Sequence, residues 1–239
     1  MALILNIETS TAVCSAALTE EEEVLFEQCS FEGPSHASLL GVYVEKAIQW
    51  SKAHGRHLDA VAVSSGPGSY TGLRIGVSVA KGLCFGAGIP LISVPTLSLL
   101  ASAAVRRMKG STDYRYCAMI DARRMEVYAA LFDASLMSIR EAKADVVDAQ
   151  TYAPYLKEGK VCFFGDGAAK CQSVITDSQA YFLPEIYPLA SEMAPLSAKA
   201  YAEKKFEDVA YFEPFYLKEF QATIAKNKVL GATHKEGMA

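Results

Sequence analysis

The chain has 239 residues, of which 51% are hydrophobic and 21% are charged. This composition is ordinary for a globular protein with a full hydrophobic core, and the length allows one large domain or two smaller ones. The formal net charge of −4 argues against a protein that binds nucleic acid through a broad basic face. If RNA is involved, we expect a partner to supply most of the positive charge.

The cysteine pattern and the absence of targeting signals indicate a protein of the cytoplasm. The six cysteines contain no C-x-x-C pair, which favours reduced, buried thiols over a disulfide framework or a zinc site. The first residues have the pattern of a strand and show no secretory signal. Glycines and prolines interrupt the apolar stretch 75–105, so this stretch does not predict a membrane-spanning helix. We therefore expect a soluble protein without a membrane partner.

The hydrophobic periodicity predicts strands and helices along the whole chain. In the first half we expect strands over residues 2–9, 12–19 and 23–31, a helix over 35–54, a strand over 58–64, a helix over 71–87, a strand over 91–94 and a helix over 96–109. In the second half we expect strands over 114–121, 125–133 and 137–147, a helix over 149–158, a strand over 161–165, a glycine turn and a further helix. A last helix is expected around 195–208, and the sequence leaves open whether it returns to the first half.

The two halves also resemble each other in sequence. Segment 7–18 aligns without gaps on segment 120–131, and each runs from a strand through an acidic residue and a polar turn into a second strand. Two βββαβα units predict the α/β fold of the actin-like ATPases (the ASKHA fold), with subdomains over 1–110 and 111–239. Proteins of this fold bind nucleotide in the cleft between the halves. The candidate cleft residues are Glu8, Thr9, Ser10 and Asp121.

A Gly-Pro-Gly-Ser turn at 66–69 connects a predicted strand to the helix over 71–87. Backbone amides at such a helix start can bind an anion, but the turn alone is a weak indication of phosphate binding. Along the helix, positions four apart form a ridge of small residues: Gly72, Gly76, Ala80, Cys84 and Gly88. An interior glycine costs about 1 kcal/mol relative to alanine, so the ridge predicts close approach by another element. That element is either the chain's own sheet or a helix of another subunit.

The helix over 35–54 carries apolar residues over roughly 180° of its surface, whereas contact with one sheet needs roughly 100°. Its second side is covered either by another helix of the same chain or by a partner subunit. We take this helix and the helix over 71–87 together as the predicted partner interface. The interface residues are Leu39, Leu40, Tyr43, Ala47, Gly72, Gly76 and Ala80.

Four motifs are informative together: ILNIETST (residues 4–11), GPGSYTGLRIG (66–76), AKGL (80–83) and IDAR (120–123). They resemble the TsaB family, also called YeaZ, and the similarity extends to about residue 218. The resemblance implies a part in making threonylcarbamoyladenosine, which lies beside the anticodon of tRNAs that read codons beginning with A. It also implies two partners, the paralogue TsaD and the ATPase TsaE.

The resemblance raises the question of whether this chain is the catalyst or its companion. TsaD binds a metal through two histidines, and by alignment Thr96 and Leu100 occupy their places. Leucine cannot ligate a metal, and one threonine hydroxyl is a poor site for a transition ion. Glu8 also stands where the family usually has aspartate. We therefore expect a non-catalytic subunit with a degenerate nucleotide cleft, no catalytic residue, no metal site, and at most weak binding of ATP or ADP, although the complex uses ATP.

We expect this subunit to scaffold and activate TsaD, to help TsaE dock and to meet tRNA through the complex. The helices of the first subdomain are expected to form both the TsaD contact and a competing homodimer. The alternative is an ATP-dependent small-molecule kinase or ATPase with Glu8, Thr9 and Asp121 at the cleft. A zinc peptidase is disfavoured because the sequence has no H-E-x-x-H motif. The basic tail from Lys218 to Lys235 is interpreted either as a solvated terminus or as a contact to tRNA or the complex.

Overall fold

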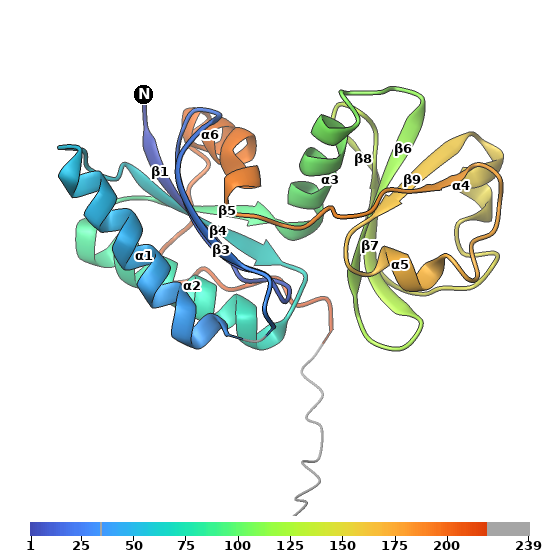
Figure 1. The fold of residues 1–239 in the computed structure, drawn as a ribbon, viewed down its shortest axis with the longest axis horizontal. Coiled ribbons are helices and arrows are strands. Elements are labelled where there is room, and N and C mark those ends of the chain that lie inside the picture. The colour runs from blue at the N-terminus through green and yellow to red at the C-terminus, as the bar shows by residue number, and fades with distance from the viewer. Residues whose placement is uncertain (34, 219–239) are drawn as a thin grey trace, which may run out of the picture.

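The computed structural model describes residues 1–33 and 35–218, which form two five-stranded sheets with helices packed around them (Figure 1). The elements of the first half are β1 (Leu3–Glu8), β2 (Cys14–Glu20), β3 (Glu23–Ser30), α1 (His36–Ala53), β4 (Ala60–Gly66), α2 (Tyr70–Ala87), β5 (Leu91–Pro95) and α3 (Thr96–Arg107). The elements that follow are β6 (Tyr114–Asp121), β7 (Glu126–Phe132), β8 (Ser138–Val146), α4 (Ala153–Lys157), β9 (Lys160–Phe164), α5 (Ala168–Cys171), β10 (Ala180–Phe182), the 3-10 helix η1 (Ser191–Met193) and α6 (Ala194–Ala202).

The two sheets have the same strand order. In the first sheet, β3-β2-β1-β4-β5, strand β1 is antiparallel to β2 and parallel to β4. In the second sheet, β8-β7-β6-β9-β10, strand β6 is likewise antiparallel to β7 and parallel to β9. The predicted duplication of an α/β unit is therefore confirmed.

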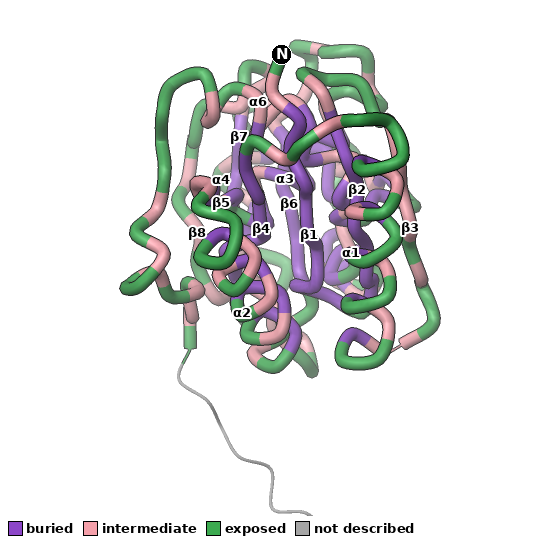
Figure 2. The backbone as a smooth tube through the Cα atoms, turned by 90° about the vertical axis from the view of Figure 1, so that its left-hand side faces the viewer, coloured by how far each residue is buried: buried purple, intermediate pink, exposed green. Residues whose placement is uncertain are grey.

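The elements are stacked in layers (Figure 1). Helices α1 and α2 cover the outer face of the first sheet, α3 and α6 lie between the sheets, and α4 and α5 cover the outer face of the second sheet. The central strands are consequently buried on both faces, as Figure 2 shows for β1 and β4 behind α2. This stacking places the carboxyl ends of β1, β4 and β6 at one end of the molecule, the lower end in Figure 1.

The gapless alignment of the two halves is wrong for single residues, although the duplication is correct. Ile7 belongs to the outer core cluster with α1 and α2, whereas its aligned partner Ile120 belongs to the inner cluster with α3. The outer face of β6 is formed instead by Cys117 and Met119. Because side chains alternate between the faces of a sheet, the alignment is displaced by an odd number of residues.

The helices of the second half are shorter than the sequence predicts. Helix α4 has five residues and α5 has four, and the short strand β10 was not predicted. The two longest described helices, α1 and α2, have 18 residues each. Within residues 1–33 and 35–218, no helix combines the length and the apolar character needed to cross a bilayer.

The predicted subdomain boundary needs a correction at its C-terminal side. Helix α6 packs against β1 and β5 of the first sheet, and Glu207 forms a β-bridge with Leu91. The chain therefore returns to the first half after β10, so the described end of the predicted subdomain 111–239 packs with the first sheet. The lysines of the predicted basic tail beyond Lys218 lie outside the described residues.

Candidate functional site

Glu8 ends β1 on the face of the first sheet that looks toward the second half. Its cross-strand neighbour Ser15 accepts a hydrogen bond from the Ala190 amide, which places both side chains on this inner face. The Glu8 side chain is fully buried; Oε1 accepts from the Ser10 amide at 2.5 Å, whereas Oε2 has no hydrogen-bond partner in the described part of the chain. Burial raises the pKa of Glu8 to about 7, against the opposing effect of Ser10. The carboxyl group is thus partly protonated at neutral pH, which disfavours it as a ligand for the Mg²⁺ of a nucleotide.

We expect Glu8→Gln to remove a pH dependence from the stability of the fold. The pKa of Glu8 rises from 4.5 to about 7 on folding, so its contribution is fully present below about pH 4.5 and is lost as the pH rises through about 7. A shift of this size corresponds to a loss of about 3 kcal/mol across the window. Urea unfolding at several pH values should show the wild type losing stability relative to Glu8→Gln as the pH rises. Parallel pH profiles for the two chains would contradict a buried carboxyl with a raised pKa.

Asp121 has different surroundings from Glu8. Its side chain is 49% exposed and lies on the outer face of β6, where it pairs with Lys170 of α5. It also accepts a hydrogen bond from the Arg123 amide at 2.8 Å. The two carboxyl groups therefore differ in the face they occupy, in burial and in partners. This is not the arrangement expected for two carboxylates that share one metal-bound nucleotide.

The Gly-Pro-Gly-Ser turn after β4 is packed against the chain's own backbone. A Cβ on Gly68 would lie 2.2 Å from the Ser10 carbonyl oxygen, and the Ser69 amide donates to the same oxygen at 2.6 Å. A Cβ on Gly66 would lie 2.5 Å from the Phe215 carbonyl oxygen. The glycines permit this close approach because they have no side chain. The Ser69 amide and the space over Gly66 are thus taken by the chain itself, and they do not fit a phosphate of ATP or ADP.

Residues 209–218 form a segment that we call the C-terminal strap. Lys81 of α2 donates to two strap carbonyl oxygens at 3.1 and 3.0 Å, and the Phe215 amide donates to the end of β4 at 2.7 Å. At its far end Lys218 pairs with Glu126 of β7 at 2.5 Å. The strap therefore runs from the first sheet to the second half, past the turn after β4. Sequence reasoning missed it because it has neither helical nor strand periodicity.

The predicted partner interface divides into buried and exposed residues. Its members that are buried within the chain are Leu40, Ala47, Gly72, Gly76 and Ala80. A Cβ on Gly72 would lie 2.1 Å from the Thr9 carbonyl oxygen, and a Cβ on Gly76 would lie 2.3 Å from the Thr9 hydroxyl. The ridge from Gly72 to Cys84 is therefore buried within the chain, as the alternative of contact with its own sheet predicts, whereas Gly88 at the end of the ridge is exposed. Leu39 and Tyr43 are half-buried, and their part in an interface stays a prediction.

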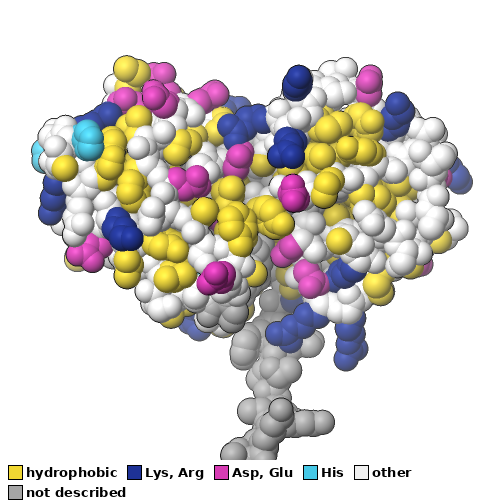
Figure 3. Space-filling model, in the orientation of Figure 1, with side chains coloured by type: hydrophobic (Ala, Val, Ile, Leu, Met, Phe, Trp, Pro, Cys, Tyr) yellow, Lys and Arg dark blue, Asp and Glu magenta, His cyan; other side chains and the backbone are white. Residues whose placement is uncertain are grey.

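A second set of small residues lies on the outer side of the same two helices. Gly41, Gly82 and Gly86 are exposed, and a Cβ on any of them would meet nothing within 4 Å. Beside them Val42 is 44% exposed and Phe85 is 86% exposed. Figure 3 shows hydrophobic side chains at the surface on this side of the molecule. These helix glycines have no packing reason within the described chain, and the sequence pattern did not separate them from the buried ridge.

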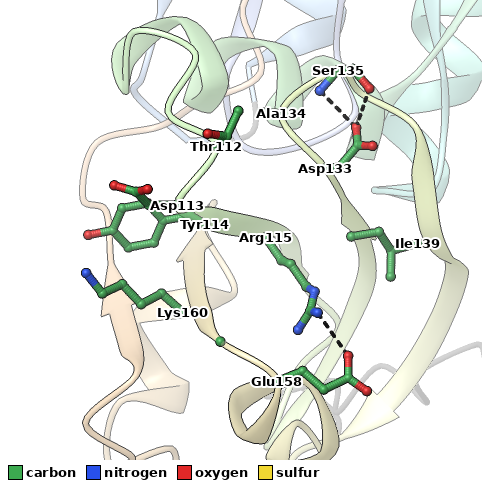
Figure 4. Close-up of a pocket in the computed structure, with 11 residues that line it drawn as sticks. Thr112, Asp113, Tyr114, Arg115, Asp133, Ala134, Ser135, Ile139, Glu158 and Lys160 are labelled. Carbon is green, nitrogen blue, oxygen red and sulfur yellow. Dashed lines mark hydrogen bonds and ion pairs between the residues drawn. The ribbon is translucent and has the colours of Figure 1, made fainter.

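A pocket of about 370 Å³ opens at the end of the second half that is opposite Asp121, by the first residues of β6 and β9 (Figure 4). Arg115 pairs there with Glu158 at 2.9 Å and donates to the Tyr155 carbonyl oxygen at 2.9 Å. The Lys160 ammonium lies 5.7 Å from the centre of the Tyr114 ring. Both cations are thus engaged by neighbouring residues of the chain. None of the site residues predicted from the sequence lines this pocket.

The chain is similar to a protein-family model, to proteins of known sequence and to solved structures. The profile of the family described as "TsaD: tRNA N6-adenosine threonylcarbamoyltransferase" matches residues 32–226. The "tRNA threonylcarbamoyladenosine biosynthesis protein TsaB" of Escherichia coli (strain K12) is 32% identical over 228 residues, covering 90% of this chain and 94% of that protein. The protein of the same name from Bacillus subtilis (strain 168) is 33% identical over 129 residues, covering 54% of each chain. Among solved structures, "YeaZ from Pseudomonas aeruginosa" has a TM-score of 0.77 at 26% identity, covering 91% of this chain and 100% of that one.

Proposed function

Because the chain belongs to the TsaB (YeaZ) family and takes part in tRNA threonylcarbamoyladenosine biosynthesis, we propose that it acts there as a non-catalytic subunit. In this role it holds TsaD in an active conformation and helps TsaE to dock. The chain has the actin-like fold that the match to the TsaD family model indicates, so its surface resembles that of a second copy of TsaD. We further propose that tRNA is reached through the complex.

The observation that carries this proposal lies in the first two turns of α3. Thr96 and Leu100 occupy, by sequence similarity, the places of the two metal-binding histidines of TsaD, and both are fully buried. Leu100 belongs to the inner hydrophobic cluster, and its Cδ1 would lie 3.4 Å from a Cβ on Gly165. A leucine packed in a core offers no ligand atom. In this proposal the metal and the reacting adenylate therefore belong to TsaD.

The kinase or ATPase alternative has less support. It requires ATP to meet Glu8 and the turn after β4. Glu8 is buried with a raised pKa, and the turn is packed against the end of β1 and against the strap. We infer that this chain alone hydrolyses little ATP and that ATP is consumed by the complex.

The outer side of α1 and α2 is the surface that we propose for TsaD. A glycine inside a helix costs about 1 kcal/mol relative to alanine. At Gly41, Gly82 and Gly86 no close contact within the described chain compensates for this cost. Close approach by helices of a partner would supply the missing contact, and the exposed Val42 and Phe85 would be covered at the same time. The homodimer would use the same surface and would therefore compete with TsaD.

Reconstitution tests the proposed function. Purified chain, TsaD and TsaE from the same organism are combined with tRNA, ATP and threonylcarbamoyl adenylate, and the tRNA nucleosides are measured by mass spectrometry. We expect the modified nucleoside only when this chain is present, and none from the chain alone. Glu8→Gln should support modification as the wild type does, whereas the kinase or ATPase alternative requires ATP turnover by the chain alone that Glu8→Gln abolishes. Equal modification without the chain would overturn the proposal.

Gly82→Leu is expected to weaken the TsaD complex at least tenfold while the chain stays folded. A Cβ at this exposed position meets nothing within 4 Å, and the rest of a leucine side chain would hold a partner helix away from α2. The matched control is Ala169→Leu, which adds similar bulk at an exposed position of α5 on the opposite side of the molecule. Affinities measured by calorimetry should separate the two variants. If both bind TsaD equally well, the outer side of α2 is not the interface.

A further inference from the structure

The turn between β6 and β7 presents two adjacent arginines in an unfavourable backbone conformation. Arg123 and Arg124 are exposed and have φ angles of 70° and 48°, in the left-handed region that glycine and asparagine adopt more readily. The conformation is fixed by hydrogen bonds: the Glu126 amide donates to the Arg123 carbonyl oxygen at 3.0 Å, and the Arg123 amide donates to Asp121 at 2.8 Å. The chain therefore holds two guanidinium groups at a tip where other residues would fit the backbone better.

The charges around this tip leave the two arginines unbalanced. The carboxylates on the two strands that flank the tip are paired, Asp121 with Lys170 and Glu126 with Lys218, and Asp166 accepts a hydrogen bond from the Asp121 amide at 3.0 Å. Lys170 also donates to the Glu126 carbonyl oxygen at 2.6 Å. In the described part of the chain neither Arg123 nor Arg124 forms an ion pair. Figure 3 shows Lys and Arg side chains gathered at this lower end of the second half.

We propose that Arg123 and Arg124 bind the phosphate backbone of tRNA in the modification complex. A guanidinium group is planar and presents donors that match phosphate oxygens bidentately, and two of them side by side can contact consecutive phosphates. Because the chain as a whole is acidic, with a net charge of −4, this local excess of positive charge is where RNA is attracted. The inference rests on the proposed function and adds a direct contact to it.

The position of the tip agrees with this contact. It lies at the carboxyl end of β6, the same end of the molecule as the end of β4 and the strap, since Lys218 of the strap pairs with Glu126 beside the tip. The proposed TsaD surface on α1 and α2 lies on the outer side of the first sheet. RNA and TsaD can therefore bind at the same time.

The test replaces the two arginines with residues that suit the turn. Arg123→Asn with Arg124→Gly removes both charges and introduces residues that readily adopt the left-handed backbone conformation of this turn. The melting temperature of the variant should therefore be equal to or higher than that of the wild type. The matched control is Arg107→Ala with Lys109→Asn, which removes two exposed charges at the end of α3 and just after it, neither of them in an ion pair with a described residue. Asparagine also tolerates the positive φ at position 109. Binding of tRNA to the complex with TsaD and TsaE is measured by fluorescence anisotropy at several salt concentrations.

We expect the tip variant to bind tRNA at least tenfold more weakly at low salt, and the slope of log K against log salt concentration to fall by about 2, roughly one for each lost phosphate contact. The control should leave both quantities unchanged. Equal affinity and slope for the tip variant and the wild type would overturn the inference. So would a loss of TsaD or TsaE from the complex, which would mark the tip as a contact to an acidic protein surface. Failure of the proposed function would be distinguishable from failure of this inference. In that case, modification in the reconstituted reaction would not depend on the wild-type chain.

Discussion

Gly72→Ala is expected to destabilise the fold by about 3 kcal/mol, at the upper end of the usual range for overpacking. The added methyl group would lie 2.1 Å from the Thr9 carbonyl oxygen. That oxygen cannot move away easily, because β1 continues directly into Thr9 and the Thr9 hydroxyl donates to the Gly72 carbonyl oxygen at 2.8 Å. The change therefore separates the start of α2 from the end of β1. Urea unfolding followed by circular dichroism measures the loss.

Gly82→Ala provides the control for this result. It makes the same chemical change in the same helix, but at an exposed position where a Cβ meets nothing within 4 Å. We expect it to stabilise the chain by about 1 kcal/mol, the difference in helix propensity between glycine and alanine. If Gly72→Ala also stabilised the chain, the end of β1 would have to yield to a methyl group, and the close packing of α2 on the first sheet would not explain the buried glycines.

The order of the elements could be read from the sequence because it depends on local periodicity. Strands such as β1 and β4 are continuous apolar runs, and α1 and α2 show helical spacing, so their positions follow from propensity and pattern. The repeat of this order in the second half was sufficient to predict the duplicated α/β fold. The short helices α4 and α5 were harder to predict, because helices of five and four residues have too few turns to show a period.

The candidate site was harder to predict because it depends on which face each side chain occupies. A shift of one residue moves a strand residue to the other side of its sheet, so the alignment of Glu8 with Asp121 joined an inner residue to an outer one. The ridge of small residues was read correctly as a place of close approach, but the sequence alone could not say that Thr9 is the neighbour of Gly72. Contacts between distant parts of the chain, such as the strap against the turn after β4, leave no local pattern at all.

Asp145→Ala is expected to destabilise the chain by about 3–5 kcal/mol, the usual result of removing one partner of a buried ion pair. Arg140 and Asp145 lie on β8 with side chains only 13% and 12% exposed, and Arg140 Nη2 is 2.5 Å from Asp145 Oδ2. Tyr152 donates its hydroxyl to the same carboxylate oxygen at 2.8 Å, and burial raises the pKa of this hydroxyl, so it stays protonated. Without Asp145, the guanidinium of Arg140 would keep the Ala129 carbonyl oxygen but lose its counter-charge, and the hydroxyl of Tyr152 would lose its acceptor. Thermal and urea unfolding should show the loss.

Replacing both members of the pair separates the penalty of an unpaired charge from the contribution of the pair. Arg140→Met with Asp145→Leu fills the same region with apolar groups and leaves no charge behind, but it leaves the Tyr152 hydroxyl without its acceptor, so we expect a loss of about 1–2 kcal/mol. Tyr152→Phe removes only one neutral donor and should cost about 1 kcal/mol, because the ion pair keeps its charge balance. The ranking that supports this account is Asp145→Ala well below both of the others. A double variant as unstable as Asp145→Ala would instead show that the pair itself, and not the charge left behind, stabilises the outer layer of the second sheet.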